Sequence, residues 1–223
     1  MLCVEFLTNF LDLSHTRANK LISSARSFAD IFEKIGEFIT STAAELDEDF
    51  IEIYPSVFVH KTAQIAPSAV FGKNVIIGAY TQVRHCAFIR GNAVVGENCV
   101  VGNSCEIKNS ILFDGVQVPH FNYVGDSILG YRTHLGAGAI TSNVKSDKSL
   151  VTVFVEGETL TTGLKKLGAI VGDFVEIGCN SVLNPGAVIG KNSTVYPLSC
   201  VRGFVPPDSI YKSKSEIIKK SRL

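Results

Sequence analysis

Apolar residues return at every sixth position along most of the chain. The series comprises Val59, Ile65, Phe71, Ile77, Val83, Ile89, Val95, Val101, Ile107 and Phe113, and later Val171, Ile177, Leu183, Ile189, Val195 and Val201. An α-helix repeats about every 3.6 residues and a strand every second residue, so neither keeps one apolar position in phase at six. A parallel β-helix does, because each unit forms one short strand and one turn. The sequence therefore predicts a mainly β solenoid of hexapeptide repeats, with three-sided coils of about 18 residues.

Two interruptions divide this repeat. Within 113–135 the apolar spacing slips, and a loop or bulge there would aim the polar residues of the run 120–126. Over 141–169 the six-residue pattern lapses, while valines alternate with other residues across 151–155 as they do in a strand. We expect a β-hairpin excursion over about 143–168. A sandwich of short strands is the competing interpretation, but its strands are spaced less regularly than this series.

Three segments follow from the pattern. Residues 1–50 lack the repeat and form a helical N-terminal segment, residues 51–207 form the β-helix, and residues 208–223 form a basic C-terminal helix or tail. The basic residues of that tail either form a solvated surface or contact a phosphate of coenzyme A (CoA).

The N-terminal segment has helical spacing. Ser14 is a plausible N-cap for a helix over 16–25, and apolar residues at three- and four-residue spacing predict an amphipathic helix from Phe28 to Leu46. We expect this helix to cover the open first coil, so that the solenoid has no bare edge. Packing against a neighbouring subunit is the alternative.

Composition narrows the functional classes. The 223 residues carry a formal net charge of zero, which gives no indication of nucleic acid or of an acidic membrane surface as a partner. The six cysteines contain no CxxC pair and the five histidines are scattered, so we expect reduced thiols and no metal site. No apolar run is long enough to span a bilayer, and no signal peptide is expected at the start. A cytoplasmic location follows as the expectation.

Charged residues replace glycine after some of the inward apolar positions. Arg90 and Lys108 are eighteen residues apart, one whole coil, and should stack on the same edge. His120 lies twelve residues further on and, with the slip in spacing, is expected near that edge. Two cations and a histidine suit a phosphorylated small molecule beside a general base. A solvated charged corner is the alternative.

Three runs carry a family resemblance. They are Gly102–Lys108 (GNSCEIK), His120–Asp126 (HFNYVGD) and Leu135–Asn143 (LGAGAITSN). Together they resemble the acetyltransferase half of the bifunctional N-acetylglucosamine-1-phosphate uridylyltransferase/glucosamine-1-phosphate N-acetyltransferase family. The run Gly163–Asp173 (GLKKLGAIVGD) is similar to related sugar-1-phosphate nucleotidylyltransferases that carry a left-handed β-helix. The resemblance implies a left-handed, single-stranded parallel β-helix and a homotrimer.

The resemblance also assigns roles to residues. It implies that His120 is the general base that takes a proton from the amine of the acceptor as the amine attacks acetyl-CoA. The substrate-binding positions that it implies are Arg90 and Lys108 for the phosphate, Tyr123 and Asn143 for the sugar, His134 where the family usually has Asn, and Lys148 nearest to the family's loop lysine. CoA is expected in a groove between subunits, near Ala139, Cys179 and Pro197.

These observations favour one function and leave two alternatives. The favoured one is an acetyl-CoA-dependent N-acetyltransferase that acts on an amino-sugar 1-phosphate, such as glucosamine or galactosamine 1-phosphate, in nucleotide-sugar metabolism. Nothing here resembles the nucleotidylyltransferase half, so we expect no pyrophosphorylase activity. The alternatives are a non-catalytic sugar-nucleotide-binding or assembly module, and an acyltransferase for another acceptor.

Overall fold

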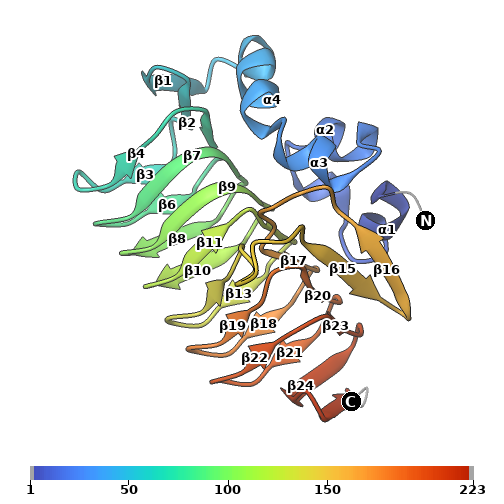
Figure 1. Ribbon diagram of the computed structural model, residues 1–223. Coiled ribbons are helices and arrows are strands. Elements are labelled where there is room, and N and C mark those ends of the chain that lie inside the picture. The colour runs from blue at the N-terminus through green and yellow to red at the C-terminus, as the bar shows by residue number, and fades with distance from the viewer. Residues whose placement is uncertain (1–2, 221–223) are drawn as a thin grey trace.

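The computed structural model describes residues 3–220 and consists of a long solenoid of short parallel strands with helices on one side (Figure 1). The strands of successive coils pair in parallel, which places the same position of each repeat in a column. The predicted fold class, a mainly β, single-stranded left-handed parallel β-helix with an N-terminal helical segment and a hairpin excursion, is confirmed.

The solenoid has three faces, which we call A, B and C in the order in which the chain visits them. Face A consists of β3 (Gln64–Ile65), β6 (Gln82–Val83), β8 (Val100–Asn103), β10 (Gln117–His120), β13 (His134–Leu135), β18 (Glu176–Ile177), β21 (Thr194–Val195) and β24 (Ser209–Ser213). Face B consists of β4 (Val70–Phe71), the first parts of β7 (Phe88–Val95) and β9 (Glu106–Leu112), β11 (Tyr123–Gly125), β14 (Ile140–Thr141), β19 (Val182–Leu183) and β22 (Cys200–Val201). Face C consists of β2 (Val57–His60), β5 (Val75–Ile77), the second parts of β7 and β9, β12 (Ile128–Leu129), β17 (Ala169–Val171), β20 (Ala187–Ile189) and β23 (Phe204–Val205).

The six-residue series forms the core. Val83 pairs in register with Val101, and Ile107 with Val124, and all four side chains are buried. Burying a side chain of this size stabilises the fold by about 1.5–3 kcal/mol, so the repeated column of apolar residues holds the coils together.

Face C differs from the other two because its outward side chains are also buried. They are Ile76, Val94, Ile111, Ile128, Ile170 and Val188. The N-terminal segment, drawn in blue in Figure 1, supplies a cover with α1 (Cys3–Thr8), η1 (Leu13–His15), α2 (Asn19–Ser24), α3 (Phe28–Phe32), α4 (Ile35–Thr42) and η2 (Ala43–Glu45). Helix α4 packs across β5, β7 and β9. Gly36 allows this close approach, because a Cβ there would lie 2.6 Å from Oδ1 of Asn92.

The predicted position and extent of the second N-terminal helix are wrong. The helix expected over Phe28–Leu46 is divided into α3, α4 and η2, and it lies along face C rather than over the first coil. The helix expected over 16–25 forms as α2, but its N-cap is Ala18 and not Ser14. Ser14 lies within η1, which is capped by Asp12, whose carboxylate accepts the backbone N–H of Ser14 at 3.0 Å. The first coil is instead extended by β1 (Phe50–Tyr54), which pairs antiparallel with β2.

The C-terminal segment, expected to be a basic helix or tail, forms a hairpin over its described residues. Strand β24 pairs antiparallel with β25 (Glu216–Lys219), and Lys212 forms an ion pair with Glu216 at 2.6 Å. Lys220, a second basic residue of this segment, donates to the backbone carbonyl of Asn192. Two of the basic residues are therefore bound to protein groups. Residues 221–223, the end of the predicted C-terminal segment, lie outside the described part of the chain.

The predicted hairpin excursion forms β15 (Thr152–Val155) and β16 (Glu158–Thr161). It packs against β20, so it covers face C next to the N-terminal segment. The ring of Phe10 lies 5.9 Å from that of Phe204, and the carboxylate of Asp173 accepts the backbone N–H of Asp12 at 2.8 Å. Face C is therefore occupied by the chain itself, which leaves faces A and B to carry a site.

Candidate functional site

His120 ends strand β10 at the edge where face A turns into face B. Its side chain is exposed, and its ring has no hydrogen-bond partner among the residues described. The turn that carries it is tightly held, with Phe121 in the left-handed region at φ 52°. Asn122, only 3% exposed, accepts the backbone N–H of His120 at 3.0 Å. The imidazole is thus free for a ligand while its backbone is fixed.

The side chain of Asn122 also ties this turn to the next coil. Its amide donates to the carbonyls of Gly136 at 2.8 Å and Ala139 at 3.1 Å, and the N–H of Gly138 donates to the carbonyl of His120 at 3.0 Å. Ala139 is itself buried, so its side chain cannot contact a cofactor on the surface. Asn122 lay within the HFNYVGD run, but sequence reasoning gave it no role.

The edge between faces A and B, which we call the histidine edge, continues past His120. His120 aligns with Asn103 in the preceding coil. Further along, Cys179 and Pro197 are both exposed, and a Cβ on Gly178 would lie 2.3 Å from the nitrogen of Pro197. The structure therefore places His120, Cys179 and Pro197 on one edge, as a shared groove requires.

Arg90 and Lys108 lie on the other border of face B, the edge with face C, which we call the cation edge. Both ammonium-to-carboxylate distances from Lys108 to Asp126 are short, 3.0 and 2.9 Å, and the Asp126 side chain is only 4% exposed. Asn109 donates to the same carboxylate at 2.9 Å, and Asn143 donates to its other oxygen. Asp126 therefore organises this edge, a role that sequence reasoning did not assign.

Two side chains reach over the outward surface of face B, Arg90 from the cation edge and Tyr123 from the first position of β11. The guanidinium of Arg90 contacts Glu106, an outward residue of face B, at 2.9 Å. Tyr123 is the next outward residue on that face, directly in register with Glu106, and its hydroxyl accepts from Asn143 at 3.2 Å. Burial, followed by the charge of Asp126, raises the pKa of Tyr123, so its hydroxyl stays protonated at neutral pH. These groups line the surface between the two edges.

The expectation that His120 stacks near the edge of Arg90 and Lys108 is wrong. His120 aligns with Asn103, whereas Lys108 aligns with Gly125. The three residues of β11 separate the two edges, roughly 10 Å at about 3.3 Å per residue. Because Arg90 and Tyr123 reach over face B, the predicted residues still border one surface, but from opposite sides.

Two predicted substrate-binding residues lie apart from this surface. His134 projects from face A, and its Nδ1 lies 2.7 Å from a carboxylate oxygen of Glu176. Lys148 is exposed in the loop before β15, where its backbone N–H donates to the carbonyl of Lys145. The structure does not bring either residue together with Tyr123 and Asn143.

A cleft of about 520 Å³ opens beside the cation edge. Arg90 and Lys108 line it together with Lys73 from the preceding coil and with Phe32 and Glu33 from the end of α3. Sequence reasoning missed Lys73 because it follows a glycine instead of replacing one. The N-terminal segment thus forms part of the wall next to the predicted phosphate-binding residues.

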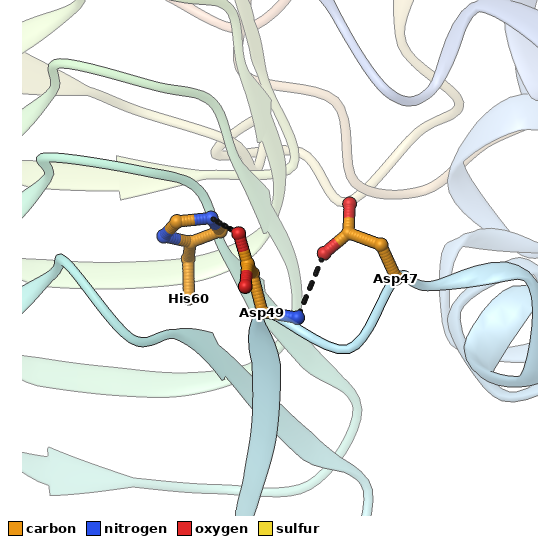
Figure 2. Close-up of side chains that lie close together, drawn as sticks. All are labelled: Asp47, Asp49 and His60. Carbon is orange, nitrogen blue, oxygen red and sulfur yellow. Dashed lines mark hydrogen bonds and ion pairs between the residues drawn. The ribbon is translucent and has the colours of Figure 1, made fainter.

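A separate group of metal-ligand type lies where the N-terminal segment enters the solenoid. Figure 2 shows His60 facing Asp49, with Asp47 on the other side of Asp49. The distance from Nε2 of His60 to the Asp49 carboxylate is 3.8 Å, and Asp47 accepts the backbone N–H of Asp49 at 3.0 Å. Lys61 also pairs with Asp49 and lowers its pKa, and Thr62 donates its N–H to Nδ1 of His60 at 3.2 Å. All three side chains are engaged by protein groups, so the cluster fastens the β1–β2 hairpin.

Comparison with known proteins gives relatives for most of the chain. Residues 80–165 match the family described as GMPPB C-terminal domain. The chain is 35% identical over 205 residues to the bifunctional protein GlmU of Methanococcus aeolicus, covering 86% of this chain and 44% of the relative. It is 35% identical over 103 residues to the bifunctional sugar-1-phosphate nucleotidylyltransferase/acetyltransferase of Sulfurisphaera tokodaii, covering 46% and 26%. The chain therefore spans less than half the length of these relatives.

Among solved structures, one match is PerB from Caulobacter crescentus in complex with CoA and GDP-perosamine. It has a TM-score of 0.36 and 16% identity, and covers 73% of this chain and 56% of that one. The resemblance to hexapeptide-repeat acyltransferase domains that the sequence runs predicted is confirmed by the relatives. None of the described helices meets the length and apolarity required to cross a membrane.

Proposed function

We propose that this chain transfers an acetyl group from acetyl-CoA to the amine of an amino-sugar 1-phosphate bound over face B. The observation that carries the proposal is the exposed, unbonded imidazole of His120 on a turn fixed by Asn122, beside a face that Arg90 and Tyr123 overhang. The acetyltransferase named among the relatives supports the same chemistry.

His120 is the general base in this proposal. Its imidazole takes a proton from the acceptor amine while the nitrogen attacks the thioester carbonyl, and the tetrahedral intermediate then expels the thiolate of CoA. A histidine is suited to this step because its ordinary pKa lies near neutral pH. Arg90 and Lys108 hold the phosphate, and Tyr123 and Asn143 orient the sugar.

The acetyl donor enters along the histidine edge. Cys179 and Pro197 are exposed on that edge beyond His120, which gives the pantetheine arm a path to the base. A homotrimer is part of the proposal, because faces A and B are open while face C is covered by the chain's own helices and hairpin. A cytoplasmic location also belongs to it, in agreement with the free thiols of Cys86, Cys99, Cys105, Cys179 and Cys200.

One observation favours a second candidate, a non-catalytic module that binds a sugar nucleotide. Arg90 is paired with Glu106, Lys108 with Asp126 and His134 with Glu176, so these three side chains already have carboxylate partners. A phosphate must compete with those carboxylates before it binds.

The release of CoA from acetyl-CoA separates the two candidates. We expect release that depends on glucosamine 1-phosphate or galactosamine 1-phosphate and that falls by about 100-fold or more in His120→Ala, the usual size of general-base catalysis. His85→Ala is the matched control, because His85 is an exposed histidine on the same edge two coils away. Acceptor-dependent release that is equal in both variants contradicts the role of His120. No release from a protein that still binds a sugar nucleotide favours the module.

A further inference from the structure

A second cleft, of about 370 Å³, lies further along the cation edge, where the chain leaves the solenoid for the hairpin excursion. It is lined by Ser142, Val144, Lys145, Ser146, Asp147, Thr152, Asn184, Pro185 and Arg202. None of the site roles derived above uses its two basic residues, Lys145 and Arg202.

The register of the coils builds one wall of this cleft. Thr141 pairs with Leu183, and Leu183 with Val201, so the residues that follow them, Ser142, Asn184 and Arg202, stack in one column. Successive coils lie about 4.8 Å apart, which puts Arg202 roughly 10 Å from Ser142 along the edge. Asn184 is fixed in this column because its amide donates to the carbonyl of Val201 at 2.9 Å.

The loop before the hairpin supplies the rest of the lining. Lys145 lies in a turn closed by the bond from the N–H of Lys148 to its carbonyl at 2.9 Å. Its ammonium makes one long contact, 3.5 Å, to the carbonyl of Leu150. Asp147 is the only acidic residue in the lining, and one of its oxygens accepts both the N–H and the hydroxyl of Ser149 at 2.9 and 2.8 Å.

The charges here differ from those in the cleft beside Arg90 and Lys108. There Arg90 and Lys108 are paired with Glu106 and Asp126, whereas within residues 3–220 neither Lys145 nor Arg202 forms an ion pair. Two unpaired cations and three hydroxyl side chains suit an oxyanion with several acceptor oxygens. Arg202 can bind two such oxygens at once through its planar guanidinium.

We propose that this cleft, with Lys145 and Arg202 as its main contacts, binds a phosphate or diphosphate group of a ligand that runs along the cation edge. Ser142 adjoins Asn143, so the cleft is continuous in sequence with the predicted sugar-binding residue. The proposal rests on the proposed function only for the choice of carrier, a nucleoside diphosphate sugar. CoA, whose pantetheine arm is placed along the histidine edge above, is the alternative carrier that the test distinguishes.

Calorimetric titration of the full chain tests the cleft, with inorganic pyrophosphate, CoA, dephospho-CoA and UDP-N-acetylglucosamine as probes at one fixed ionic strength. We expect Arg202→Gln and Lys145→Gln to weaken pyrophosphate binding by roughly tenfold each, the effect of losing one charge-assisted hydrogen bond. Asp147→Asn keeps the acceptor for Ser149 and removes the negative charge, so it should bind pyrophosphate more tightly. Lys166→Gln is the control for charge, because Lys166 is exposed and outside the cleft.

The other probes identify the carrier. A loss of affinity for CoA but not for dephospho-CoA assigns the cleft to the 3′-phosphate, and an equal loss for both assigns it to the diphosphate of CoA. A loss restricted to UDP-N-acetylglucosamine assigns it to a sugar nucleotide. Unchanged binding of every probe in Arg202→Gln and Lys145→Gln, or no binding of any probe to the unaltered chain, overturns the proposal. These outcomes are independent of CoA release, so an inactive protein can still contain the cleft.

Discussion

The two edges that border face B hold their polar side chains in opposite ways. On the histidine edge, the backbone of His120 is fixed by Asn122 and its ring has no partner in the described chain. On the cation edge, the side chains themselves are fixed, since Lys108 is bound by both oxygens of the buried Asp126. A general base must be free to exchange a proton, whereas a group that positions a substrate gains from being held in place. The contrast therefore agrees with a division between chemistry and positioning.

Asp126→Ala is expected to break the cation edge with the largest effect on stability. It leaves Lys108 partly buried without its counter-charge and removes the acceptor of Asn109 and Asn143. Loss of one partner of a buried pair costs about 3 kcal/mol of unfolding free energy or more, which chemical denaturation measures.

The exposed pair on the same edge is the control for Asp126→Ala. Glu106→Gln removes the partner of Arg90, which is half exposed, and should cost less than about 1 kcal/mol. Equal losses in the two variants would show that Asp126 does not organise the edge.

Asn122→Ala tests the histidine edge and should have the next largest effect on stability. The substitution leaves two buried carbonyls and the N–H of His120 without their partner, at a cost of about 1–3 kcal/mol. Because the turn then holds His120 less firmly, kcat should fall more than KM changes. Asn103→Ala is the matched control one coil earlier, where the side chain makes a single bond of 3.3 Å to the carbonyl of His85. An Asn122→Ala protein that is destabilised but has an unchanged kcat would reduce Asn122 to a structural residue.

The repeat along the sequence predicts the solenoid well because one physical requirement, an inward apolar side chain per strand, is met at every sixth residue. Val83, Val101 and Ile107 all occupy this inward column. Counting residues in this way does not predict on which edge of the solenoid a polar residue lies. Twelve residues cover two sides of a three-sided coil, so His120 lies on a different edge from Lys108 although both follow an apolar position.

The cover of face C was missed for a different reason. Its outward residues, such as Ile76, Val94 and Ile111, stand next to the inward ones and add apolar residues beside the six-residue series. This pair of neighbouring apolar residues, one inward and one outward, recurs once per coil and indicates that other protein groups cover the face. The pattern cannot distinguish a cover formed by the chain's own helices from one formed by another subunit. The roles of Asn122 and Asp126 depend on hydrogen bonds between coils, which no spacing in the sequence reveals.

The most direct test of the account is a comparison of Arg90→Gln with His120→Ala in steady-state kinetics with glucosamine 1-phosphate and acetyl-CoA. Arg90 is exposed, and in the proposed function it positions the phosphate, so we expect its loss to raise KM for the sugar phosphate by up to roughly tenfold, with kcat within about twofold. His120→Ala should lower kcat by about 100-fold or more, with little change in either KM. That split would support the division between the two edges. A fall in kcat alone for Arg90→Gln, or a change in KM alone for His120→Ala, would contradict it.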